Sequence, residues 1–131
     1  ASIQWFRRAA EQGEADAQFN LGRLYASEVD GMYKKGRAAP ADDAQAFKWY
    51  RLSAEQGHTQ AQVRLAQLFA KGLGEVARDQ VQAYKWMSLA AASGEPTAAK
   101  VIADYAAQMK PEQVQQAQLL VQEWKRRQSA R

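Results

Sequence analysis

The chain of 131 residues is 47% hydrophobic and 24% charged, which is the composition of one globular domain. It contains no cysteine, which excludes a disulfide scaffold, a thiolate nucleophile and a metal site with cysteine ligands. The net charge of +4 equals the four cations of the last seven residues, since the other 14 Lys and Arg balance 14 Asp and Glu. The rest of the chain has no basic stripe, so we expect no nucleic-acid partner. No apolar run reaches the roughly 18 residues of a transmembrane helix, so we expect no membrane span.

Helices are predicted along the whole chain, because apolar residues recur with helical period while β-branched residues and proline are scarce. Gly13 ends the first helix as a C′ residue. Asp42 and Asp43 place negative charge at the N-terminal end of another helix, which suits its dipole. Pro111 begins the last one, whose apolar face carries Trp124. The predicted fold class is all-α, with seven helices over residues 3–12, 15–26, 42–56, 59–71, 78–93, 96–109 and from 111 onward.

One helical segment is written three times, as WFRRAAEQG at 5–13, WYRLSAEQG at 49–57 and WMSLAAASG at 86–94. A second block, AQFNLGRLY at 17–25, recurs as AQVRLAQLF at 61–69 and in degenerate form at 98–106. The intervals between copies are 44 and 37 positions, and the extra seven residues fall in one loop within 28–39. Such periods are typical of a solenoid of antiparallel helix pairs.

Positions separated by these two intervals form columns that should share one environment. Two columns hold only alanine, which lets paired helices approach closely, and a third holds Trp5, Trp49 and Trp86. We expect these tryptophans in the core and not as platforms for sugars or bases. The alanine columns are Ala10, Ala54 and Ala91, and Ala17, Ala61 and Ala98.

The repeated pattern A-x-x-W-Y-[RK]-x-A-A-E-Q-G-x-x-x-A-Q-x-x-L-G-x-x-Y resembles the signature of Sel1-like repeats, relatives of the tetratricopeptide repeats. The likeness is strong over 1–26 and 44–71 and good over 78–94. The closing MKPEQVQQAQLLVQEW is similar to the tail helix of many secreted bacterial members. The resemblance implies an α-solenoid of about three repeats that acts as an adaptor for protein complexes. It also implies a bacterial periplasmic or envelope location, with the cytoplasm as the alternative.

A single domain is expected over 1–131. The first helix matches the second helix of a pair, so either an upstream repeat has been removed or this helix caps the array. The final helix should seal the other end. The expected parts are an N-terminal helix at 1–13, a repeat at 14–57 with the inserted loop 28–39, a repeat at 58–94, a degenerate repeat helix at 95–110, and a capping helix with a basic tail at 111–131.

A polar face on the first helix of each pair is the leading candidate for a partner site. If these helices line the inner curve of the solenoid, their polar side chains form a groove suited to a peptide. The alternative is a solvated face with no partner. The candidate residues are Asp16, Asn20, Arg23, Ser27, Gln60, Arg64, Gln67 and Lys71.

The inserted loop is a second candidate, because it departs from the family pattern and combines an aromatic residue with three cations. Its residues could hold an acidic or apolar surface, and the alternative is a loop with no specific role. It is not a phosphate loop, since Arg37-Ala38 follows Gly36 where such loops have Lys and Ser or Thr. The candidate residues are Tyr33, Lys34, Lys35 and Arg37.

No pattern of residues in the sequence indicates a catalytic site. His58 is the single histidine, so a histidine-rich metal site is excluded, and its expected role lies in the turn. We expect no enzyme, no cofactor and no metal. The predicted function is a noncatalytic scaffold that binds a protein or peptide. The alternative is an envelope-associated binder of peptidoglycan or exopolysaccharide, or an accessory subunit of an envelope enzyme, which exposed aromatic residues such as Phe19 and Tyr33 would favour.

Overall fold

The computed structural model describes residues 2–26, 28–29, 32–33, 42–72 and 76–130. Within them, the all-helical class and the seven helices are confirmed. A two-stranded antiparallel ribbon lies inside the segment predicted as an inserted loop, and the sequence analysis did not predict it. The elements are α1 (Ser2–Glu11), α2 (Ala15–Tyr25), β1 (Glu28–Val29), β2 (Met32–Tyr33), α3 (Asp43–Glu55), α4 (Thr59–Lys71), α5 (Gln80–Ala92), α6 (Ala98–Ala107) and α7 (Pro111–Ser129).

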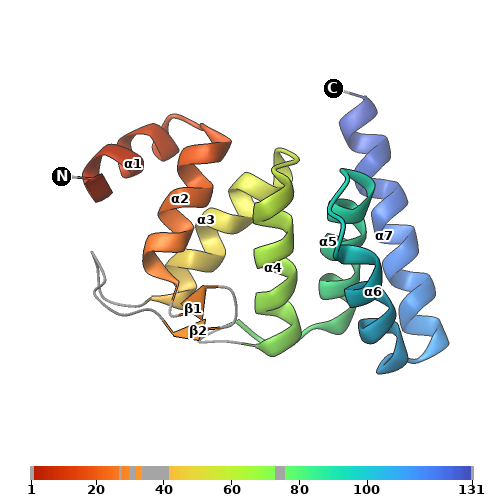
Figure 1. The fold of residues 1–131 in the computed structure, drawn as a ribbon. Coiled ribbons are helices and arrows are strands. Elements are labelled where there is room, and N and C mark those ends of the chain that lie inside the picture. The colour runs from red at the N-terminus through yellow and green to blue at the C-terminus, as the bar shows by residue number, and fades with distance from the viewer. Residues whose placement is uncertain (1, 27, 30–31, 34–41, 73–75, 131) are drawn as a thin grey trace.

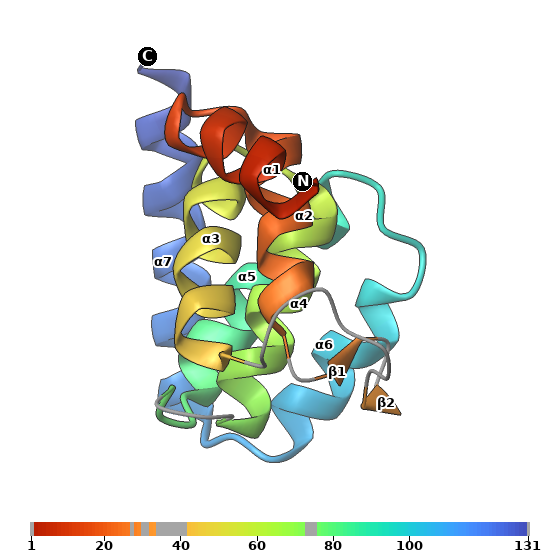
Figure 2. The same ribbon diagram turned by 90° about the vertical axis from the view of Figure 1, so that its left-hand side faces the viewer.

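Consecutive helices pack against one another in a row that runs from α1 to α6 (Figure 1). Seen along this row, α2, α4 and α6 form one layer, and α3, α5 and α7 form the other (Figure 2). The last helix packs on α5. Each long helix therefore has one side toward the neighbouring layer and one side toward solvent.

The α2–α3 and α4–α5 linkers differ in length but end in the same hydrogen bonds. Asp42 and Asp79 are the N-caps of α3 and α5, and each side chain accepts the backbone N–H three residues on, at 3.1 Å. The backbone N–H of Asp42 donates to the carbonyl of Tyr25, and that of Asp79 donates to the carbonyl of Phe69, both at 2.8 Å. The seven extra residues of the first linker therefore leave the junction between helices unchanged.

The core follows the predicted alanine columns. Five of the six alanines are buried, Ala91 is partly buried, and Ala54, Ala61 and Ala98 have no exposed surface. Trp49 and Trp86 are buried as predicted, at 5% and 2% exposure. The indole of Trp86 meets that of Trp124 edge to face, with ring centroids 6.3 Å apart.

Trp5 corrects the prediction, because 69% of its surface is exposed. Trp49, in the same column, packs with Ala10 of α1 and with Ala17 and Leu21 of α2. The helices that precede α3 thus cover Trp49. Among the described residues no helix precedes α1, so the corresponding face of α1 is open.

Two buried glutamines tie the helix pairs together, and periodicity did not reveal them. Gln18 and Gln62 occupy one column and donate to the carbonyls of Ala10 and Ala54, at 3.1 and 3.2 Å. The amide oxygen of Gln18 accepts from Gln56 Nε2 at 2.9 Å. The amide oxygen of Gln62 is buried without a partner among the described residues. Ser93 replaces Gln56 at the corresponding helix end, and its side chain is too short to repeat this bond.

We predict that Ser93→Gln stabilises the protein by about 1 kcal/mol, because it supplies a donor to the orphaned oxygen of Gln62. Ser93 and Gln56 have nearly the same backbone conformation, with φ of −88° and −87°. A glutamine side chain at position 93 would therefore leave the backbone in the same direction as that of Gln56. Urea denaturation measures the change, with Ser93→Ala as the control that adds no amide. Equal stability of the glutamine variant and the wild type would contradict the prediction.

Gly22 marks the closest approach of α2 to α3. A Cβ atom at this position would lie 2.6 Å from Cδ1 of Tyr50, whose ring is buried. The corresponding residue of the next unit is Ala66, and there Met87 replaces Tyr50. The two units therefore fill the same joint with glycine and tyrosine in one case and with alanine and methionine in the other.

Gly22→Ala should cost about 1–3 kcal/mol through overpacking, although alanine is the better helix former. In a Tyr50→Met background the cost should largely vanish, because the joint then has the composition of the second unit. A double-mutant cycle on the free energy of unfolding measures this coupling. The same cost in both backgrounds would show that the two residues do not determine each other.

Candidate functional site

Polar side chains of α2 and α4 surround two adjacent depressions, which share Phe19, Arg23 and Gln60. We call these two depressions the α2/α4 groove. Asp16, Asn20 and Arg23 are spaced at i, i+4 and i+7 along α2, and Gln60, Arg64 and Gln67 repeat this spacing on α4. Because both helices lie in one layer, the two rows face the same side. Six of the eight residues predicted for this face thus line one continuous surface.

Phe19 forms the floor of the groove, and here the sequence prediction was wrong. It was expected to be exposed, but only 5% of its surface is accessible. The imidazole of His58 stacks on its ring, with centroids 4.7 Å apart, and the guanidinium of Arg23 lies 5.7 Å from the ring centroid. Phe19 therefore supports the polar rim and offers little aromatic surface of its own.

His58 joins the two helices that form the groove. Its Nδ1 accepts the backbone N–H of Ala61 at 3.2 Å and caps α4, which agrees with the expected role in the turn. Its Nε2 lies 2.9 Å from Oδ1 of Asp16 on α2. Since Nδ1 accepts, the proton of the neutral ring lies on Nε2 and is donated to Asp16. The cap and the contact between units thus use the two nitrogens of one ring.

The rim of the groove combines both signs of charge with amide groups. Asp16 has a side chain that is 91% exposed, Arg23 and Gln60 are exposed, and Arg64 is half-buried. Arg64 Nη1 donates to Gln67 Oε1 at 3.4 Å. Such a surface can hydrogen-bond a peptide backbone and pair with charged side chains.

The remaining predicted residues do not contribute to this geometry. Lys71 is exposed and does not line either depression. The backbone of Tyr33 pairs with Glu28 in the ribbon. Ser27, Lys34, Lys35 and Arg37 lie outside the described residues.

Glu95 and Thr97 line the far end of the groove and were missed. Thr97 stands in the column of Asp16 and Gln60, and Glu95 stands in the column of His58. The hydroxyl of Thr97 donates to Glu95 Oε1 at 2.9 Å. Extension of the columns into the third, degenerate unit was the signal that could have found both.

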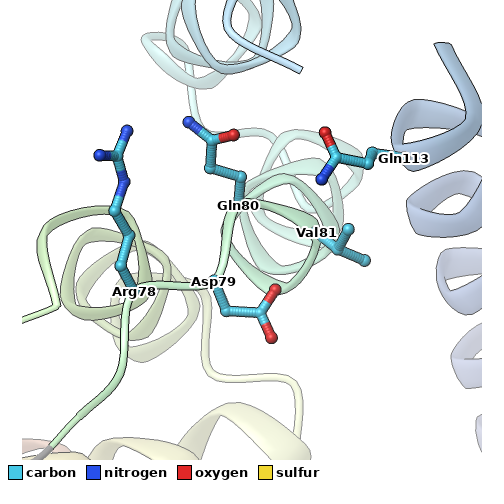
Figure 3. A pocket seen from close by; sticks show the side chains of 5 residues that line it. All are labelled: Arg78, Asp79, Gln80, Val81 and Gln113. Atoms are coloured by element: carbon cyan, nitrogen blue, oxygen red, sulfur yellow. The ribbon is translucent and has the colours of Figure 1, made fainter. Parts of the chain in front are cut away.

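Another depression lies between the N-terminal ends of α5 and α7, where Gln113 of α7 is opposite Val81 (Figure 3). Its polar groups are already used within the protein. Asp79 caps α5, and Arg78 Nη2 donates to Gln108 Oε1 at 3.3 Å. The amide of Gln80 also bonds to Gln108, in either of its two orientations. This depression is therefore a weaker candidate than the groove.

Among the described residues no three metal-binding side chains of His, Asp or Glu gather in one place. Two groups of the described chain have shifted pKa values, and neither lies in the groove. Burial raises the pKa of Tyr105, with a further contribution from Asp104. Burial lowers the pKa of Lys85, and the negative charge of Glu55 partly opposes this. None of the described helices is long and apolar enough to cross a membrane.

The repeats of this chain match a known protein family. The Sel1 repeat family matches residues 1–14, 15–58 and 59–95. The chain belongs to the Sel1 repeat family. This confirms the predicted family and its three repeats, and the helical arrangement above is the fold expected of it. No curated protein matched the chain.

Two solved bacterial structures are similar to this Sel1 repeat chain. One is a protective antigen present in uropathogenic Escherichia coli strains that displays an SLR fold, with 36% identity over 93% of the chain and a TM-score of 0.82. The other is a Sel1 repeat protein from Oxalobacter formigenes, with 37% identity over 76% of the chain and a TM-score of 0.66. The matches cover only 24% and 37% of those proteins.

The shifted pKa of Lys85 predicts a dependence of stability on pH. Between the lowered folded-state pKa and 10.5 the unfolded chain binds more protons at this group, so stability rises with pH in that window. Lys85→Met removes the cost of burying the charge. The variant should have the higher Tm at pH 7, and its advantage should shrink as the pH approaches 10.5. Lys48→Met, an exposed residue of the same column, is the control, and a lower Tm for Lys85→Met at both pH values would contradict the prediction.

Proposed function

We propose that this Sel1 repeat chain is a noncatalytic scaffold that binds a protein or peptide in the α2/α4 groove. The observation that carries the proposal is the convergence of six polar side chains from two repeats on one surface above Phe19. Asp16, Asn20, Arg23, Gln60, Arg64 and Gln67 are assigned to partner contact. Lys71, Ser27 and the loop residues Tyr33, Lys34, Lys35 and Arg37 remain predicted partner contacts, separate from the lining of the groove.

The composition of the groove favours a peptide over a polysaccharide. Sugar-binding surfaces present exposed aromatic rings, whereas Phe19 is buried and already covered by Arg23 and His58. Amide and guanidinium groups at regular spacing suit the repeating carbonyl and N–H groups of an extended peptide. A role as a peptide binder is therefore favoured over a role as a binder of peptidoglycan or exopolysaccharide, or as an accessory subunit of an envelope enzyme.

A bacterial periplasmic or envelope location is part of the proposal. It is supported by the likeness of α7 to the tail helix of secreted members and by the bacterial origin of the two similar structures. An adaptor role fits the same location, since a solenoid presents a long surface for partners and needs no catalytic residues.

The test is a selection of peptides from a random display library on the immobilised chain, followed by calorimetric titration of the selected peptides. Arg23→Ala combined with Arg64→Ala should weaken binding by about 1.4–2.7 kcal/mol, a factor of ten to a hundred. Lys125→Ala combined with Arg126→Ala removes the same charge from α7 and should leave the dissociation constant unchanged. Equal affinity of the groove variant and the wild type for all selected peptides would exclude this surface.

A further inference from the structure

A further pocket lies on the opposite side of α4 from the groove, at the junction of α3, α4 and α5. Its volume is about 380 Å³, within the range of roughly 300–1,000 Å³ that is usual for small-molecule sites. Phe69 and Trp86 are among its apolar walls. Its polar side chains are Arg51 and Glu55 from α3, and Gln82 and Lys85 from α5.

Three hydrogen-bond donors at this pocket have no acceptor in the described part of the chain. Lys85 is 8% exposed, and its Nζ lies 4.4 Å from the ring centroid of Trp86, without a hydrogen bond or ion pair. The side chains of Arg51 and Gln82 also form none there. Glu55 offsets the burial of the Lys85 charge only in part and forms no ion pair with it, and so the site is suited to an anion that comes from outside.

The first unit contains residues equivalent to those of the pocket, but there the arginine is already hydrogen-bonded. Arg7 stands in the column of Arg51, and its guanidinium donates to the hydroxyl of Tyr25 and lies over that ring. Phe69 takes the place of Tyr25 in the second unit and has no hydroxyl, so Arg51 remains available. Lys48 lies over Trp49 at 4.6 Å, as Lys85 does over Trp86, but Lys48 is exposed.

Helix α7 holds Glu55, the acidic residue of the pocket, in place. Trp124 Nε1 donates to Glu55 Oε2 at 3.3 Å, and Gln128 donates to the backbone carbonyl of Glu55 at 3.4 Å. The charges that act on Lys85 are those of Glu55, Arg127, Arg51 and Glu123. With Lys85 itself, three cations face two carboxylates, which leaves an excess of one positive charge.

We propose that the pocket binds a carboxylate carried on a small apolar group, such as an aromatic side chain. Lys85, Arg51 and Gln82 would hold the carboxylate, and the partly exposed rings of Phe47 and Phe69 would take the apolar part. The same chemistry is offered by a free organic acid and by the C-terminal residue of a peptide. The site is independent of the α2/α4 groove, because it uses the other side of α4.

The experiment is NMR titration of the full chain, with the indole N–H of Trp86 as the reporter. The probes are phenylacetate, its uncharged analogue phenylacetamide, and a tetrapeptide that ends in phenylalanine with a free or an amidated C-terminus. Phenylacetate, or the peptide with the free carboxylate, should give a saturable shift, and each neutral partner should bind at least tenfold more weakly. Binding of phenylacetate alone identifies a free acid, and tighter binding of the free peptide identifies a chain terminus.

Three variants separate a role of the pocket from a loss of folding. Lys85→Gln should weaken binding about tenfold or more, whereas Lys48→Gln, its exposed equivalent, should leave it unchanged. Phe69→Tyr removes no donor but restores the hydroxyl that occupies Arg7 in the first unit, so it should also weaken binding while the Tm is retained. The proposal is overturned if no probe gives a saturable shift, if charged and neutral probes bind equally, or if Lys85→Gln binds like the wild type.

Discussion

The close approach of paired helices through alanine and glycine is the constraint on which the rest of the structure depends. Where Gly22 meets Tyr50, no side-chain atom fits between the helix and the ring. Ala61 and Ala98 lie in the first turns of α4 and α6, and neither residue has exposed surface. This tight joint brings the helices near enough for single side chains to bridge them. Gln18 reaches Ala10, Ser53 donates to the carbonyl of Ala15 at 2.7 Å, and His58 reaches Asp16.

Both candidate sites follow from this spacing. On one side of α4, residues spaced at i, i+4 and i+7 align with the same spacing on α2 and build a polar rim over Phe19. On the other side, α3 and α5 come close enough to enclose a pocket of mixed character. One helix thus takes part in two surfaces with different chemistry. The groove has balanced charges at its rim, while the pocket has a positive excess and deeper apolar walls.

The sequence predicted the family, the seven helices and the buried columns, because these depend on a pattern that is repeated within the chain. It failed where the environment depends on a neighbour. Trp5 shares a column with Trp49, but only Trp49 has helices on its far side. Phe19 belongs to the outward face of α2 by helical period, yet His58 of the next unit covers it. The pocket at Lys85 could not be found from periodicity either, since its lining comes from three helices and its acidic residue, Glu55, is held by Trp124 of α7.

The linker between α2 and α3 carries a consequence of its own. Asp42 follows Tyr25 after 17 positions and Asp79 follows Phe69 after 10, yet both pairs are joined by the same 2.8 Å hydrogen bond. The length of chain between the two helices of one repeat is therefore uncoupled from the geometry of their junction. Residues can be gained or lost at this point without turning one helix of the repeat against the other. In evolution such a junction can acquire new binding elements, and in protein engineering it offers a place to graft a peptide beside an undisturbed scaffold.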